Sequence, residues 1–205
     1  LRVAKAYALA FAVNPRGGDH LHTNCVCQFG GSPEIVSHAN RITQTSQGAN
    51  PLVANGKTLM VKWHEDMCCV SDSLGMCFFN TQSSYRVDMK ILAKLYSAAT
   101  GIETTPDQMW CAGERILTLE RAINLREGLR KEDDYLPTRM YDEKIESGPT
   151  EGLVLERDEF EKMLEEYYEL HGWDRKNGVP LEDTLRRLGL EEIAETIRTP
   201  RQQDA

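Results

Sequence analysis

Residues 56–77 read GKTLMVKWHEDMCCVSDSLGMC, which predicts a helix that ends in a short polar turn. Apolar residues recur near the 3.6-residue period of an amphipathic helix, at Leu59, Met60, Trp63, Met67 and Val70. Gly75 suits a left-handed helix end, or a place where a bulky ligand approaches the backbone. The turn also offers a carboxylate, Asp72, and a thiol, Cys77. It is interpreted either as a helix cap followed by a small buried residue, or as a grip on a polar cofactor beside a metal cluster.

The composition is that of a globular protein with one domain or two small ones. Of 205 residues, 40% are hydrophobic and 27% charged, with a net charge of −8. Such a charge argues against nucleic acid or an anionic membrane surface as the main partner. No apolar run approaches the roughly 20 residues of a membrane helix, and no export leader is recognisable, so a cytoplasmic location is expected. The chain opens at Leu1 in a helical pattern without a capping residue, which predicts a fragment of a longer polypeptide.

The cysteines are predicted to be reduced thiols, because the sequence lacks an export signal. There are six: Cys25, Cys27, Cys68, Cys69, Cys77 and Cys111. None forms a C-x-x-C pair, and neither C-x-C nor C-C spacing suits chelation of one ion. A zinc-binding helical domain that combines these thiols with His20, His22 or His64 is the third-ranked interpretation of the chain.

The fold class is predicted to be all-α and multihelical, because no run of alternating apolar and polar residues stands out. Beyond the opening stretch, helical patterns cover residues 1–13, 33–44, 87–99, 105–128, 157–171, 181–188 and 190–197. Pro33 and Pro106 suit first helical positions, and Gly101 suits a stop. The polar residues 129–156 are predicted to form a surface excursion and a candidate boundary between subdomains. The tail 199–205 is expected to be disordered.

The loop PRGGDHLH at 15–22 is a second candidate site. Gly17 and Gly18 would let the backbone approach a substrate or cofactor. His20 is suited to proton transfer near neutral pH. A solvated turn is the alternative.

Four separated stretches now coincide: PRGGDHL at 15–21, DSLGMC at 72–77, GERILTLERAINLREG at 113–128 and YYELHGWD at 167–174. Their order and spacing resemble the C-terminal region of the tungsten-containing aldehyde:ferredoxin oxidoreductase family. The closing residues, from the GWD at 172–174 to about residue 190, are similar as well. The resemblance covers nearly the whole chain and is weakest over 23–55.

The resemblance implies an enzyme in which tungsten (or molybdenum) is held by two pyranopterins beside a [4Fe–4S] cluster. Such enzymes oxidise a small-molecule aldehyde to a carboxylic acid, or in related branches reduce an aromatic thioester. Electrons leave through the cluster to ferredoxin or another redox protein. The cofactor performs the electron chemistry, and the protein supplies the cage and the proton route.

The resemblance also implies roles for single residues. Asp72 and Gly75 would contact a pterin, and Met76 stands where the family has leucine. Cys77 would ligate the cluster, and His20 would lie beside tungsten and move a proton. These roles agree with the chemistry, since a carboxylate accepts hydrogen bonds from a pterin edge and a cluster needs thiolates.

Two parts of the family pattern are missing from this sequence. The other three cluster ligands come from an upstream C-x-x-C-x-x-x-C run, and the N-terminal pterin-covering domain precedes that. The chain alone is therefore expected to bind neither cofactor and to be inactive until the rest of the parent polypeptide, or a partner subunit, completes it. The alternative is a helical binding or structural module of the same fold without redox cofactors. Substrate-pocket walls are expected within 23–55 and in the loops that flank the motifs.

Overall fold

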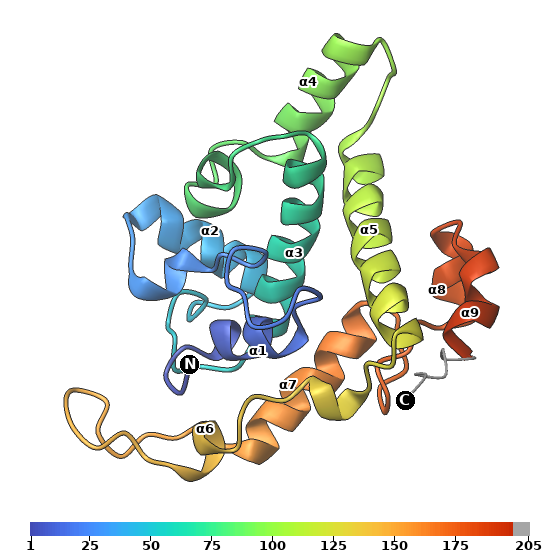
Figure 1. Ribbon diagram of the computed structural model, residues 1–205. Coiled ribbons are helices and arrows are strands. Elements are labelled where there is room, and N and C mark those ends of the chain that lie inside the picture. The colour runs from blue at the N-terminus through green and yellow to red at the C-terminus, as the bar shows by residue number, and fades with distance from the viewer. Residues whose placement is uncertain (199–205) are drawn as a thin grey trace.

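The computed structural model describes residues 1–198 and confirms the all-α fold (Figure 1). Apart from one bridge between Trp173 and Pro180, the described residues contain no β structure. The predicted disorder of 199–205 lies outside the described residues. The elements are α1 Lys5–Val13, η1 Val26–Phe29, α2 Pro33–Thr43, α3 Lys57–Ser73, η2 Phe79–Ser83, α4 Met89–Thr100, α5 Pro106–Arg126, η3 Lys131–Asp133, α6 Arg139–Asp142, α7 Arg157–Leu170, α8 Glu182–Arg187, η4 Glu191–Ile193 and α9 Ala194–Arg198.

Helix boundaries follow local chemistry. At the start of α5, the Thr105 hydroxyl accepts from the Gln108 amide at 3.2 Å, and the Gln108 side chain accepts from the Thr105 amide at 2.8 Å. This reciprocal capping satisfies two donors that have no partner inside the helix. Gly101 ends α4 in the left-handed conformation. The first helix begins at Lys5 and not at Leu1 as predicted.

The long helices α3 and α5 pack against each other and form the centre of the molecule (Figure 1). Gly113 makes their approach possible. A Cβ atom at this position would overlap the backbone carbonyl of Asp66 on α3. Because a carbonyl on a neighbouring helix cannot move aside cheaply, only glycine keeps the two backbones this close.

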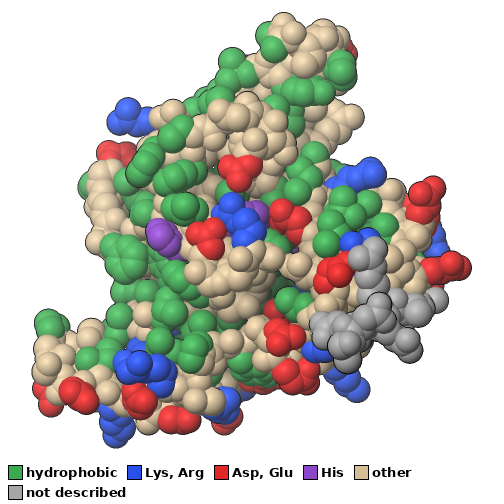
Figure 2. Space-filling model, in the orientation of Figure 1, with side chains coloured by type: hydrophobic (Ala, Val, Ile, Leu, Met, Phe, Trp, Pro, Cys, Tyr) green, Lys and Arg blue, Asp and Glu red, His purple; other side chains and the backbone are tan. Residues whose placement is uncertain are grey.

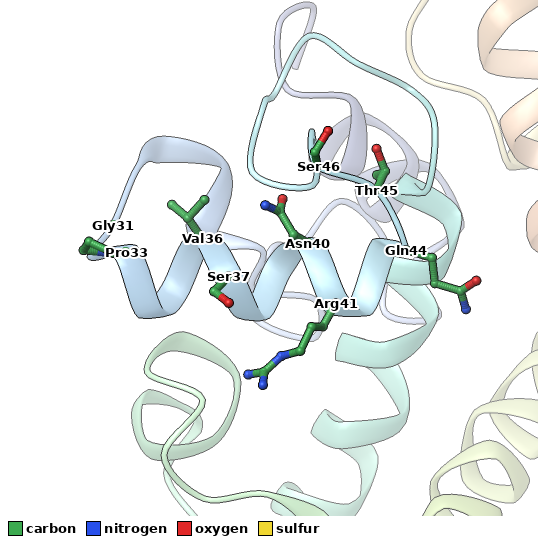
Figure 3. A pocket seen from close by; sticks show the side chains of 9 residues that line it. All are labelled: Gly31, Pro33, Val36, Ser37, Asn40, Arg41, Gln44, Thr45 and Ser46. Carbon is green, nitrogen blue, oxygen red and sulfur yellow. The ribbon is translucent and has the colours of Figure 1, made fainter.

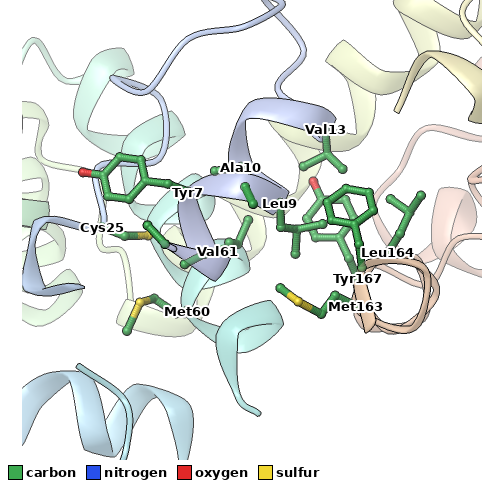
Figure 4. Packing of buried hydrophobic residues seen from close by; sticks show 14 of the residues in the cluster. Tyr7, Leu9, Ala10, Val13, Cys25, Met60, Val61, Met163, Leu164 and Tyr167 are labelled. Carbon is green, nitrogen blue, oxygen red and sulfur yellow. The ribbon is translucent and has the colours of Figure 1, made fainter. Parts of the chain in front are cut away.

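The largest core cluster brings together α1, the first half of α3 and α7. Figure 4 shows Leu9, Val61 and Tyr167 among the side chains that meet there. Three alanines of α1 are fully buried, which lets that helix pass through the core with small side chains: Ala6, Ala8 and Ala10. Two smaller clusters lie elsewhere. One joins the second half of α3 to α4 and the start of α5, and the other joins the end of α5 to α8 and α9.

Residues 129–156 are more than the predicted surface excursion. Leu136, Tyr141 and Leu155 are buried and belong to the largest core cluster. The exposed tip of the segment is held by hydrogen bonds between the backbones of Ile145 and Leu153 and of Gly152 and Ile145. The burial of these three residues could not be predicted from the polar sequence of the segment. They are spaced too far apart to show a helical or strand period.

Candidate cofactor site

The end of α3 presents the DSLGMC turn. Gly75 has a φ of 65°, in the left-handed region, as predicted. Its amide donates to the Asp72 carbonyl at 3.1 Å, and the Met76 amide donates to the Ser71 carbonyl at 2.8 Å. This pair of bonds is the Schellman arrangement that closes a helix on glycine. The backbone of the turn is therefore fixed by the helix itself.

The side chains of this turn face outward. Asp72, Gly75 and Cys77 are exposed, and Met76 is half-buried against the second core cluster. A Cβ atom at Gly75 would meet nothing within 4 Å. The interpretation of Cys77 as a small buried residue is therefore wrong, and the turn offers an accessible carboxylate and thiol beside bare backbone.

The PRGGDHLH loop is held by its own polar groups. Asp19 forms an ion pair with Arg16 at 2.6 Å, and its other carboxylate oxygen accepts from the Leu21 amide at 2.7 Å. Asn14 bridges the start of the loop to the Asp19 carbonyl at 2.9 Å. The exposed His20 ring stacks beside Phe11, with ring centres 6.1 Å apart. The loop thus presents His20 on a fixed support.

A single thiol joins this loop to the end of α3. Cys68 Sγ lies 3.8 Å from the Leu21 carbonyl oxygen and 3.7 Å from Asp72 Oδ2. The residue that follows His20 and the carboxylate of the DSLGMC turn therefore contact the same sulfur atom. Two motifs far apart in the sequence lie next to each other in the structure.

Behind them, His22 and Cys69, both named in the zinc interpretation of the sequence, converge with Glu120, which that interpretation did not include. His22 Nε2 lies 3.9 Å from Cys69 Sγ and 3.8 Å from Glu120 Oε2. Burial, followed by the charge of Arg16, lowers the pKa of His22 to about 4, so its imidazole is neutral at pH 7. Adjacent residues on a helix point about 100° apart, so Cys68 can face the loop while Cys69 faces α5.

The YYELHGWD stretch anchors α7 to α3. The Tyr167 hydroxyl donates to Glu65 Oε2 at 3.0 Å, and His171 Nε2 lies 3.5 Å from that oxygen. Burial raises the pKa of Glu65 well above its ordinary value and lowers the pKa of His171 well below its own. Burial therefore favours the neutral form of both groups, and both belong to the interior and not to an accessible site.

A second anchor joins α5 to the segment after η3 through a buried ion pair, and to α7 through the ring of Tyr168. Arg121 donates to both carboxylate oxygens of Asp134, at 2.9 and 2.7 Å, and its Nε donates to the Gly178 carbonyl at 3.1 Å. The guanidinium also lies over the rings of Tyr168 and Trp173, at 5.6 and 5.4 Å. Two of the four recognisable stretches thus hold helices together.

Residues 23–55 line a pocket, and the expectation that this segment supplies walls of a substrate pocket stays a prediction. A cavity of about 770 Å³ runs along α2 (Figure 3). Its lining comprises Gly31, Pro33, Val36, Ser37, Asn40, Arg41, Gln44, Thr45 and Ser46. None of the predicted site residues lines it. Another cavity, of about 650 Å³, borders Gly17 and Gly18 and extends to Tyr135.

One face of the molecule carries charges of both signs. The face in Figure 2 mixes acidic and basic side chains with hydrophobic areas and shows no continuous basic patch. Within residues 1–198, no helix has the length and apolar character needed to span a bilayer.

The chain is similar to the active site complex BamBC of benzoyl coenzyme A reductase, solved with 1,5-dienoyl-CoA. The TM-score is 0.60 at 26% identity, and the match covers 71% of this chain and 21% of that chain. The chain belongs to the aldehyde ferredoxin oxidoreductase family, because residues 1–190 match the family model for its domains 2 and 3.

Curated relatives agree with this assignment. The tungsten-containing aldehyde ferredoxin oxidoreductase of Pyrococcus horikoshii is 33% identical over 193 residues, which is 94% of this chain and 29% of the relative. The enzyme of the same name from Pyrococcus furiosus is 32% identical over the same extent. The WOR-like subunit of an aliphatic sulfonate oxidoreductase from Pyrococcus furiosus is 28% identical, covering 93% of this chain and 26% of that subunit. The resemblance inferred from four motifs is confirmed, and the chain spans less than a third of these relatives.

Proposed function

We propose that this chain is part of an enzyme that oxidises aldehydes to carboxylic acids with a tungsten (or molybdenum) bispyranopterin and a [4Fe–4S] cluster. Ferredoxin or another redox protein would accept the electrons. The observation that carries the proposal is the exposed Asp72–Cys77 turn, joined through Cys68 to the loop that bears His20. The six free cysteines suit a reducing compartment such as the cytoplasm.

The exposed turn fits a pterin. The Asp72 carboxylate is open to accept hydrogen bonds from N–H groups at a pterin edge. Gly75 leaves space in which a flat ring system can approach the backbone, and Met76 is steadied by the apolar cluster beneath it. When bound, the metallopterin supplies the two-electron chemistry. Asp72, Gly75 and Met76 would bind it and set its orientation.

Cys77 would supply one thiolate to the iron–sulfur cluster. Its thiol is exposed, whereas Cys25, Cys27, Cys68 and Cys69 are buried within the chain. A cubane cluster takes about four thiolate ligands, so the others would come from the rest of the parent polypeptide or from a partner subunit. The isolated chain is accordingly proposed to be inactive.

His20 would transfer a proton to or from the substrate or a water molecule. Its ring is exposed, one face rests beside Phe11, and the loop backbone is fixed by the Asp19 bonds. An imidazole held in this way can give or take a proton at a ring nitrogen. In this proposal His20 acts toward the substrate or a water molecule on the side of the site that faces Asp72.

The proposal is tested by metal analysis of the longer parent protein, purified without oxygen. Tungsten or molybdenum and about four iron atoms per chain are expected. Cys77→Ala should remove most of the iron, and Asp72→Asn should lower the pterin content. Cys111→Ala is the matched control, because Cys111 is the other exposed cysteine and lies on α5. A parent protein with neither metal would refute the proposal and favour the helical binding or structural module.

A further inference from the structure

Behind the exposed turn, donor atoms from three segments meet below the surface. They are His22 from the loop, Cys69 from α3 and Glu120 from α5, and they lie within 4.8 Å of one another. We propose that these three side chains form a binding site for a divalent transition-metal ion, best matched by Zn²⁺. The site is separate from the Asp72–Cys77 turn, and it does not depend on the proposed function because all three ligands belong to this chain.

The spacing of the donors is close to that of a tetrahedral site. His22 Nε2 lies 3.9 Å from Cys69 Sγ and 3.8 Å from Glu120 Oε2. Zinc–sulfur bonds of about 2.3 Å and zinc–nitrogen bonds of about 2.0 Å, at a tetrahedral angle, separate the two donors by roughly 3.5 Å. Small rotations of three side chains would bring the donors to this distance without moving the helices.

The donors are buried and incompletely paired. His22 and Cys69 are each only 3% exposed. Glu120 Oε2 is buried at the atom level and has no hydrogen-bond partner among the described residues. A carboxylate oxygen withdrawn from water in this way is costly unless something compensates it. A cation between the three donors would compensate it.

The local charges also favour a cation. The carboxylate of Glu120 is one of the three donors, and a second carboxylate, Asp66, lies three residues before Cys69 on α3. The nearby cations are engaged elsewhere, since Lys62 pairs with Asp66 at 2.8 Å and Arg16 pairs with Asp19 at 2.6 Å.

The donor set selects the class of metal. One imidazole nitrogen, one sulfur and one carboxylate oxygen suit Zn²⁺ or Fe²⁺, whereas Mg²⁺ and Ca²⁺ prefer sites made only of oxygen. Three protein ligands leave a fourth position open. A bound ion would tie the loop that carries His20 to α3 and α5, and so would hold His20 in place relative to Asp72.

Titration of the complete chain with Co²⁺ and then Zn²⁺ tests the site. Co²⁺ should give a thiolate-to-metal absorption band at one ion per chain, and Zn²⁺ should abolish it. Substitution of a first ligand should weaken Zn²⁺ binding more than about 100-fold, since even changes to groups that support a ligand cost 10–100-fold. The variants are Cys69→Ala, His22→Gln and Glu120→Gln. Circular dichroism of each variant verifies that it is folded.

Cys68→Ala is the matched control, because its sulfur faces Leu21 and Asp72 and not the three donors. It should keep full affinity. A folded chain that binds neither ion overturns the proposal, and so does binding that survives Cys69→Ala or disappears with Cys68→Ala. Zinc content of the longer parent protein gives a second measurement. Zinc lost in Cys69→Ala with tungsten and iron retained supports the site, and no zinc in the unsubstituted protein overturns it.

Discussion

The DSLGMC turn and the Arg121–Asp134 pair both lie in or beside stretches shared with the family, yet their surroundings are opposite. Asp72 and Cys77 are exposed at a helix end. Arg121 and Asp134 are 4% and 2% exposed, and all three guanidinium nitrogens of Arg121 donate hydrogen bonds. Residues in or beside these stretches therefore serve two purposes in this chain. The exposed set is free to bind something outside the chain, and the buried set keeps the helices in register.

This contrast is testable because burial decides what a substitution costs. Removing one member of a buried ion pair leaves an uncompensated charge, whereas removing an exposed group leaves only a change in solvation. Substitutions in the buried pair should lower stability, and those in the exposed turn should affect only the bound cofactor.

The largest effect is expected for Arg121→Met. It leaves the Asp134 carboxylate buried with Tyr168 as its remaining side-chain donor, and the free energy of unfolding should fall by about 3–5 kcal/mol. Urea unfolding of the chain measures this. Arg126→Met, which breaks an exposed pair with Glu127, is the control and should cost less than about 1 kcal/mol. A loss below about 1 kcal/mol for Arg121→Met would remove the distinction between the two regions.

Asp66 should make the free energy of unfolding of the chain depend on pH. Burial, opposed by Lys62, raises the pKa of Asp66 from 3.8 to about 6. Between these values the folded state holds a proton that the unfolded state releases, so the contribution of Asp66 to stability falls as pH rises. The free energy of unfolding of the Asp66→Asn variant, relative to that of the unsubstituted chain, should therefore rise by up to roughly 3 kcal/mol between pH 4 and pH 7.

Unfolding in urea at several pH values measures the difference between the two proteins. Asp107→Asn, at an exposed carboxylate in the first turn of α5, is the control for the loss of a carboxylate outside the core. A stability difference that shrinks as pH rises would contradict the raised pKa.

Substitution of Gly113 in α5 should cost more stability than substitution of Gly75, which follows the end of α3. Gly113→Ala places a Cβ against the Asp66 carbonyl and should cost about 1–3 kcal/mol through overpacking. Gly75→Ala meets no neighbour and should cost about 1 kcal/mol, because its φ of 65° is unfavourable for a side chain. Thermal unfolding ranks the two variants. The reverse order would mean that α3 and α5 can separate easily.

The smallest effect on stability is expected at the exposed turn. Cys77→Ala and Asp72→Asn should each change the free energy of unfolding of this chain by no more than about 0.5 kcal/mol. The same substitutions should alter the metal and pterin content of the longer parent protein. A marked loss of stability in the isolated chain would show that the turn is structural.

Helix positions could be predicted because their signals are local. Pro106 after Thr105, Gly101 and Gly75 each act within a few residues, and the structure has a helix boundary at every one. The exposure of Cys77 could not be settled from six residues, because it depends on what packs over the helix end. The anchors Leu136, Tyr141 and Leu155 escaped notice for the same reason.

The sequence offered the cysteines and His22 as possible zinc ligands, but not the convergence of His22 and Cys69 with Glu120. Glu120 lies in a run of alternating charges, which is typical of a solvated helix face. Its neighbour in space, Cys69, was judged by its spacing from Cys68 and not by the helix face it occupies. Contacts between distant segments depend on how helices cross, and that depends on details such as the missing side chain of Gly113.

The division of the interior into three clusters has a mechanical consequence. The first half of α3 belongs to one cluster and its second half to another, while the two ends of α5 belong to the second and the third. Each of these two helices therefore connects core clusters that are packed separately. Amide hydrogen exchange should show that the clusters open at different free energies. The Asp72 carboxylate and the Cys77 thiol at the end of α3 should move together with the core cluster around α4. Local unfolding of that cluster would therefore displace the two groups while the cluster around α1 and α7 stays packed.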